Sequence, residues 1–223
     1  EQAKIGYVAA YPYPEVISGY TAFLLGVRSV VEDAVMSVRY TNKWNDYLQE
    51  KKFAREFIKE GCVIISQHSD TAGPAAAAGT PVYLISYNQS MTDVAPTTYL
   101  TGCKINWQPY IMGAVAAVLN DKTIEQSIRG NVNGNDLGAG FEENWVEMLE
   151  LNEFTCAAGT QEKLREVIEQ LEKGKIEVFQ GDYTGTDPDN PQDVCDLRKA
   201  YKENDKSSAP TFHYVLDDVI TVE

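Results

Sequence analysis

Hydrophobic and polar positions follow two alternating patterns along the first half of the chain. Short apolar runs, typical of buried strands, begin near residues 4, 34, 63 and 81. Amphipathic segments at helical spacing fill 15–31 and 46–60, and a short alanine run at 75–78 occupies the place of a third helix. This alternation predicts an α/β fold with a parallel sheet and helices on both faces.

Aromatic and polar residues follow each of these four strands. Ligands of open α/β sheets bind outside the carboxyl ends of the strands, and in a parallel sheet these ends share one edge. Aromatic walls with a few fixed polar groups are typical of sites for flat, polar ligands, and amide side chains can pair with an adenine edge. The alternative is that the rings only cover the rim of the sheet and that 67–70 forms a solvated turn. The residues at the four tips are Tyr11, Tyr13, Trp44, Asn45, Asp46, Gln67, His68, Asp70, Tyr87, Asn88 and Gln89.

The pattern continues less regularly after residue 98. The segment 108–119 is apolar on nearly all sides, which predicts a helix buried on more than one face. Glycine and asparagine at 130–140 predict turns or a hairpin. The remaining expectations are strands at 98–107, 153–158, 176–179 and within 211–222, helices at 141–150 and 161–173 with Thr160 as N-cap, and helical turns at 196–203.

Composition excludes several classes of protein. The chain has 223 residues and a net charge of −14, which argues against nucleic acid and against an anionic membrane surface as partners. Four cysteines match no zinc or redox motif, Cys62 and Cys103 are expected to be buried, and two histidines are too few for a histidine-built metal site. The acidic segment 181–193 lacks the spacing of an EF-hand and is predicted as a solvated loop. We therefore expect no metal and no cofactor.

The sequence contains no recognisable catalytic arrangement. It has no nucleophile elbow and no histidine next to a positioned nucleophile. Asp46 and Asp70 could form a carboxylate pair, yet nothing in the sequence indicates that their acidity is shifted. We therefore expect binding without catalysis and do not predict an enzyme.

Several ordered segments resemble the basic membrane protein family, the substrate-binding lipoproteins of certain ABC transporters. The nearest branch includes members that bind purines and purine nucleosides. The matching segments come in the right order and spacing over most of the chain to Gly181. They are 4–10, 14–17, 22–30, Trp44 with Asp46, 65–70, 87–88, 106–110 and 175–181.

The resemblance implies a two-lobed clamshell of the type I periplasmic-binding kind. It implies that 1–105 forms a ligand-binding α/β lobe, and that 106–223 supplies the hinge, the return segments and the C-terminal part. The family's first lobe, which would precede Lys4, has no counterpart in this sequence, nor has the signal and lipid-anchor region. The helix at 108–119 would pack in that other lobe, and without it a homodimer could form through the exposed surface. The resemblance also implies a transporter permease as partner and an extracytoplasmic location, as a cell-surface lipoprotein or periplasmic protein.

The same resemblance suggests ligand-binding residues, with a purine base as first candidate and a nucleoside as second. Two departures stand out: Asn88 replaces an aspartate of nucleoside-binding relatives, and apolar residues near Ile105 replace a lysine. The alternatives are a ligand-sensing domain of a regulator or receptor, and an enzyme acting on nucleosides with Asp46 or Asp70 as base. The expected ligand-binding residues are Tyr13, Trp44, Asp46, Gln67, His68, Asp70, Asn88 and Trp107.

Overall fold

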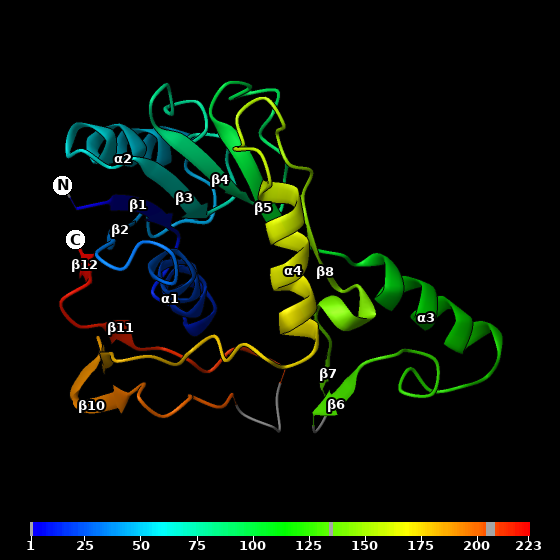
Figure 1. Cartoon of the computed structure of the whole chain (residues 1–223). Coiled ribbons are helices and arrows are strands. Elements are labelled where there is room, and N and C mark those ends of the chain that lie inside the picture. Colours follow the sequence, from blue (N-terminus) through cyan, green and yellow to red (C-terminus); the bar gives the residue numbers. More distant parts are fainter. Residues whose placement is uncertain (1, 134–135, 204–207) are drawn as a thin grey trace.

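A seven-stranded sheet forms the centre of the computed structural model, which describes residues 2–133, 136–203 and 208–223 (Figure 1). The strand order is β12-β2-β1-β3-β4-β5-β8, and all neighbours are parallel except β5 and β8. The strands of this sheet are β1 (Lys4–Ala9), β2 (Val35–Tyr40), β3 (Ile64–His68), β4 (Tyr83–Tyr87), β5 (Tyr99–Ile105), β8 (Val146–Met148) and β12 (Ile220–Val222).

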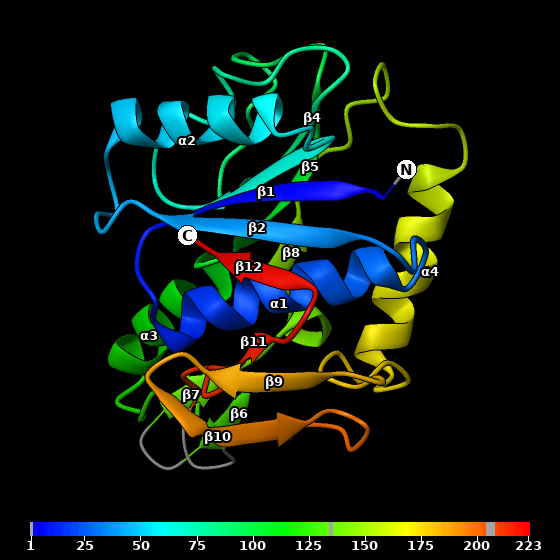
Figure 2. The same ribbon diagram turned by 90° about the vertical axis from the view of Figure 1, so that its left-hand side faces the viewer.

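Two helices cover opposite faces of the sheet, as the sequence predicts (Figure 2). Helix α1 (Pro14–Arg28) packs on one face against Ile5 and Tyr7, and helix α2 (Tyr47–Lys59) packs on the other against Val8. Side chains of a strand alternate between faces, so the uniformly apolar β1 can serve both helices. The approach of α2 is close, since a Cβ atom on Gly6 would lie 2.6 Å from the Phe57 ring.

Smaller elements complete the fold. Strands β9 (Thr184–Asp187), β10 (Asn190–Asp196) and β11 (Val215–Leu216) form a second, antiparallel sheet beside α1. The expected hairpin in the glycine-rich region is confirmed as β6 (Asn131–Asn133) paired with β7 (Asp136–Gly138), although residues 134 and 135 lie outside the described part. Helices α3 (Gln108–Leu119) and α4 (Thr160–Glu172) and the 3-10 turn η1 (Phe141–Glu143) complete the described elements.

The prediction of a third helix in the first half, at 75–78, is wrong. Four alanines between Gly73-Pro74 and Gly79 are too few to offset the cost of nucleating a helix. The segment closes as a turn, in which the backbone N–H groups of Ala77 and Ala78 both donate to Pro74 O at 3.1 Å.

The expected elements at 141–150, 153–158 and 176–179 are also wrong. After η1, the chain passes Asn144 in the left-handed region and pairs as β8 with the free edge of β5. This pairing satisfies edge backbone groups that a helix would leave exposed. The segment 153–158 forms turns around Asn152, and 176–179 has no strand partner among the described residues.

Three further expectations in the C-terminal half are corrected. Thr160 donates its hydroxyl to Ala157 O at 2.7 Å and starts α4 without capping it. The acidic segment 181–193 is largely the β9–β10 hairpin and not a loop. The expected helical turns at 196–203 are absent because the backbone of Leu197 bonds across to Gly181 and Tyr183.

Helix α3 has the expected bounds but is not buried on more than one face. Only Ala117 of this helix is buried, and its apolar side chains Met112, Val115 and Val118 are more than half exposed. Figure 1 shows α3 projecting away from the large sheet. An all-round apolar pattern shows that a helix needs partners, but it does not say which chain or segment provides them.

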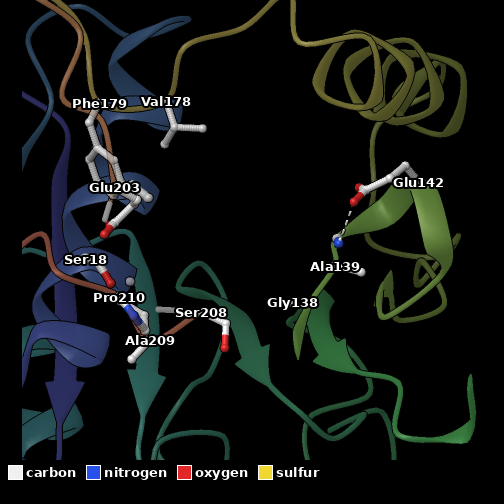
Figure 3. Close-up of a pocket in the computed structure, with 13 residues that line it drawn as sticks. Ser18, Gly138, Ala139, Glu142, Val178, Phe179, Glu203, Ser208, Ala209 and Pro210 are labelled. Carbon is white, nitrogen blue, oxygen red and sulfur yellow. Dashed lines mark hydrogen bonds between the residues drawn. The ribbon is translucent and has the colours of Figure 1, made fainter. Parts of the chain in front are cut away.

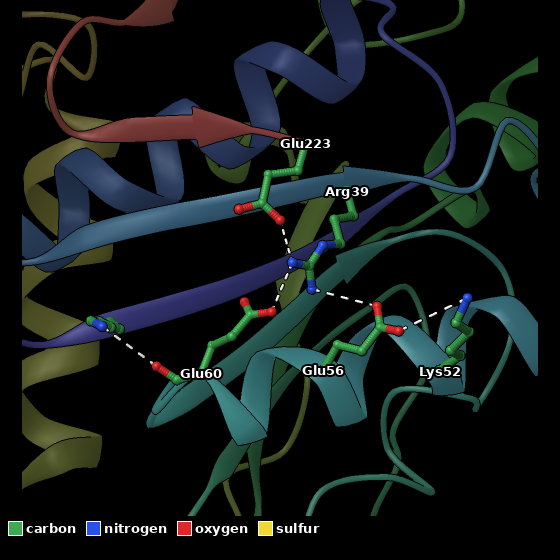
Figure 4. A network of polar contacts seen from close by, with 6 residues as sticks. Arg39, Lys52, Glu56, Glu60 and Glu223 are labelled. Carbon is green, nitrogen blue, oxygen red and sulfur yellow. Dashed lines mark hydrogen bonds and ion pairs between the residues drawn. The ribbon is translucent and has the colours of Figure 1, made fainter.

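Arg39 joins the C-terminus to the first half of the fold (Figure 4). Its guanidinium contacts Glu56 on α2 at 3.6 Å and Glu60, directly after this helix, at 2.8 Å, and it also pairs with Glu223 beyond β12. It lies over the Phe57 ring at 4.6 Å. The network therefore links the end of β12 to β2 and to the C-terminal end of α2.

Two further features concern the helices and the cysteines. None of the helices among residues 2–133, 136–203 and 208–223 has the length and apolar character needed to cross a membrane. All four cysteines are unpaired thiols; Cys62 is buried as expected, whereas Cys103 is exposed on β5.

Candidate functional site

The carboxyl ends of β1, β2, β3 and β4 lie side by side at one edge of the sheet. Register fixes this arrangement, because Ala9 pairs with Tyr40 on β2 and with His68 on β3. The residues that follow each strand therefore gather here, as the parallel topology predicts.

Five rings from four strand ends form an aromatic cluster at this edge: Tyr11, Tyr13, Trp44, His68 and Tyr87. Tyr11 stacks on Tyr13 with centroids 5.0 Å apart and planes 13° apart, and it contacts Trp44 at 5.7 Å. Trp44 contacts His68 at 6.1 Å, and His68 contacts Tyr87 at 4.2 Å. These contacts connect the ends of β1, β2, β3 and β4 without a break.

His68 is the buried member of this cluster. It ends β3 and is only 7% exposed, and burial lowers the pKa of its imidazole to about 4. The ring is therefore neutral at physiological pH, with one nitrogen able to donate a hydrogen bond and the other able to accept one. A neutral imidazole among aromatic rings suits a neutral, hydrogen-bonding ligand.

The backbone after β2 and β3 holds Trp44 in place. The N–H of Asp70 donates to Trp44 O at 2.7 Å, which ties the two strand ends together. Glu50 on α2 is fully buried and reinforces the same turn. Its carboxylate accepts hydrogen bonds from Ser69 Oγ at 2.8 Å and from Thr71 Oγ1 at 2.7 Å.

Gln67 and Asp46 have structural partners outside the aromatic cluster. Gln67 points to the opposite face from His68, and its amide donates to Ser69 O at 2.9 Å and to Thr71 O at 2.8 Å. Asp46 caps α2 by accepting from Gln49 N at 3.1 Å. The hydrogen bond from Lys43 holds the pKa of Asp46 below its usual range, which makes its carboxylate a weaker base.

The other three expected residues lie at the margin of the cluster or away from it. Asn88 adopts a left-handed conformation, and its side-chain oxygen accepts from Ile105 N at 3.1 Å. Burial raises the pKa of the neighbouring Tyr87, and a hydrogen bond with Asn88 opposes this effect. Asp70 is exposed, and Trp107 is 64% exposed at the start of α3.

A groove of about 580 Å³ lies on the side of α1 that carries Gly19. Figure 3 shows Ala139 and Glu142 across the opening from Phe179 and Pro210. Sequence reasoning missed this groove, since its walls come from segments without periodic patterns that are distant from α1 in the chain. Gly19 connects the two features, because a Cβ atom there would lie 3.1 Å from His68 Nδ1.

Residues 1–178 match the model of a family described as Bmp, ABC transporter substrate-binding protein PnrA-like. The chain belongs to the Bmp family. Both the fold and the segments that suggested the resemblance agree with this assignment.

Two curated relatives of this chain differ in what their names say they bind. The chain is 30% identical over 202 residues to a purine-binding protein of Brucella abortus, covering 90% of this chain and 53% of that protein. It is 37% identical over 111 residues to a putative ABC transporter glucose-binding protein of Haloferax volcanii, covering 49% of this chain and 28% of that protein. The chain thus spans about half or less of the length of these relatives.

A solved structure supports the fold of the Bmp family member. An ABC transporter solute-binding protein from Conexibacter woesei superposes with a TM-score of 0.61 at 17% identity. The match covers 78% of this chain and 56% of that one. At this identity the likeness establishes the architecture alone.

Proposed function

We propose that this chain is a ligand-binding lobe of the substrate-binding component of an ABC importer, and that the aromatic cluster contacts the ligand. The observation that carries the proposal is the unbroken series of rings from Tyr13 to Tyr87 at the carboxyl edge of a parallel sheet. Membership of the Bmp family supports binding for transport over a reaction.

A purine base is the ligand that these features favour. Aromatic faces stack on a planar heterocycle, and the neutral His68 can donate to or accept from its edge. A net charge of −14 disfavours an anionic ligand. The Brucella relative is named a purine-binding protein, whereas the Haloferax relative is named for glucose, so a sugar is the competing ligand class.

The proposal extends to partners and location. A substrate-binding component delivers its ligand to a transporter permease, which is the expected macromolecular partner, and it works outside the cytoplasm. We propose attachment to the membrane through a lipid anchor, as in the lipoproteins that the sequence resembles. The occupied carboxylate oxygens of Asp46 weaken the alternative of an enzyme that uses this residue as base.

Thermal unfolding with adenine, guanine, adenosine and glucose tests the proposal. A ligand present at about 100 times its dissociation constant adds about 2.7 kcal/mol to stability, which is a visible shift in Tm. We expect a purine to produce this shift in the native chain and in Tyr83→Ala, a half-exposed tyrosine at the opposite end of the strands. We expect Tyr13→Ala and Trp44→Ala to lose it.

The same panel separates the competing outcomes. A shift with glucose alone would replace the ligand class while keeping the site. An equal purine shift in all three variants would place binding outside the aromatic cluster. If no compound shifts the Tm, the proposal that this chain binds the ligand by itself is contradicted.

A further inference from the structure

The small antiparallel sheet brings together three metal-ligating side chains that lie far from the aromatic cluster in the chain. Asp187 ends β9, Asp193 lies in β10, and His213 directly precedes Tyr214 and β11. One ligand atom from each lies within 4.8 Å of the others. The spacing of the three residues follows no local metal motif, which explains why the sequence indicates no such site.

The protonation state of His213 is constrained by its backbone neighbour. Its Nδ1 lies 2.7 Å from Thr211 O, and a carbonyl oxygen can only accept, so Nδ1 carries a proton. The second nitrogen, Nε2, faces the two carboxylates. A backbone carbonyl on one ring nitrogen is the usual arrangement that orients a metal-binding histidine through the other nitrogen.

The distances leave room for an ion between these groups. His213 Nε2 lies 3.8 Å from Asp187 Oδ2 and 3.8 Å from Asp193 Oδ2, which is too long for a hydrogen bond. Ligand atoms about 2.1 Å from a tetrahedral metal lie about 3.4 Å apart, so a small closure of the side chains would complete the geometry.

The opposite carboxylate oxygens already have partners that hold them in place. Asp193 Oδ1 accepts from the Tyr214 hydroxyl at 3.1 Å, and Asp187 Oδ1 accepts from Asp189 N at 2.9 Å. No lysine or arginine in the described part of the chain forms an ion pair with either carboxylate. Two oriented carboxylates and one imidazole therefore converge without a permanent cation.

We propose that Asp187, Asp193 and His213 bind a divalent first-row transition ion such as Zn²⁺. Calcium and magnesium prefer oxygen ligands alone, whereas zinc accepts mixed imidazole and carboxylate ligands. The three side chains are partly exposed, so water can complete the coordination. The ion links β9 and β10 to the segment before β11. It thereby stabilises the small sheet that lies beside α1.

Calorimetric titration of the metal-free, untagged chain with Zn²⁺ tests this proposal. We expect one site per chain and an upward shift in Tm on loading. Because each residue supplies a ligand, Asp187→Asn, Asp193→Asn and His213→Ala are each expected to weaken binding by at least about tenfold. Asp189→Asn is the matched control, since it removes an acidic side chain from the same turn without removing a ligand.

A second measurement identifies the histidine. The chain has two histidines, His68 and His213, so imidazole NMR signals are readily assigned with the His213→Ala variant. We expect Zn²⁺ to shift the His213 signals and to leave His68 unchanged. This readout also serves if an aspartate variant is poorly folded, because the Zn²⁺ titration itself uses the native chain.

Three results would overturn the proposal. Equal loss of affinity in Asp189→Asn would indicate diffuse attraction to an acidic surface. Unchanged affinity in His213→Ala would place the ion elsewhere. Absence of Zn²⁺ binding by the native chain would show that the three side chains converge without forming a metal site.

Discussion

Gly19 on α1 faces the imidazole of His68 so closely that a Cβ atom would lie 3.1 Å from Nδ1. The missing side chain lets the helix pack against the buried end of β3. The same helix contains Gly26, where an added Cβ atom would meet nothing within 4 Å. The two glycines therefore form a matched pair within one helix.

Substitution of each glycine by alanine should have different effects on stability. Alanine in a helix is favoured over glycine by about 1 kcal/mol, so Gly26→Ala is expected to raise the free energy of unfolding by up to that amount. Gly19→Ala should gain less or lose stability, because the methyl group forces His68 to move. Urea unfolding of both variants measures the difference, and equal gains would show that the contact is not restrictive.

Stability should depend on pH through His68. Its pKa falls from 6.5 to about 4 on burial, so between these values the unfolded state binds the proton and the folded state does not. The free energy of unfolding is therefore unaffected by His68 above pH 6.5, and it falls by about 3 kcal/mol in total as the pH drops toward 4.

Comparison with His68→Gln isolates this contribution. Carboxyl groups that titrate in the same range affect both proteins alike. As the pH falls from 6.5 toward 4, the native chain should therefore lose stability relative to the His68→Gln variant. A difference that stays constant from pH 7 to pH 4 would contradict the buried, neutral state of His68.

Loss of the Arg39 network should destabilise the whole fold. The guanidinium side chain is only 13% exposed and joins β2, α2 and the C-terminal Glu223. Arg39→Ala is expected to lower the free energy of unfolding by about 1–3 kcal/mol. Arg55→Ala on the exposed side of α2 is the control, with a change within about 0.5 kcal/mol. Similar values for both variants in chemical denaturation would show that the network contributes little.

The apolar face of α3 should drive self-association of the chain when it is examined alone. Val118 is 78% exposed among other exposed apolar side chains of this helix, and Val30 beyond α1 is 79% exposed. We expect Val118→Lys to reduce self-association in sedimentation velocity and Val30→Lys to leave it unchanged, because exposed apolar patches mediate contacts. A monomer at all concentrations, or equal behaviour of the two variants, would argue against a homodimer through α3.

The candidate site was only partly accessible from the sequence. The parallel order of β1 to β4 predicts that Tyr13, Trp44 and His68 share an edge, and the structure brings them together. Adjacency to His68 in the sequence also predicts Gln67 at this edge. Neighbouring residues of a strand point to opposite faces, so Gln67 and His68 cannot both face the same cluster.

Local patterns by themselves determined the first half of the fold. The apolar runs and amphipathic segments define β1 to β4, α1 and α2, because burial of each face depends on residues close together in the chain. The family resemblance rests on these segments together with 106–110 and 175–181, and the family match confirms it.

Tertiary structure alone decided the pairing of distant segments. Strand β8 adds to the edge of β5, β12 adds to β2, and Asp187, Asp193 and His213 meet in the small sheet. These contacts form because free strand edges and isolated polar groups find partners across the folded chain, and no short-range periodicity records which partner they find. The sequence thus determined what each local element buries, and the folded chain determined which distant side chains it brings together.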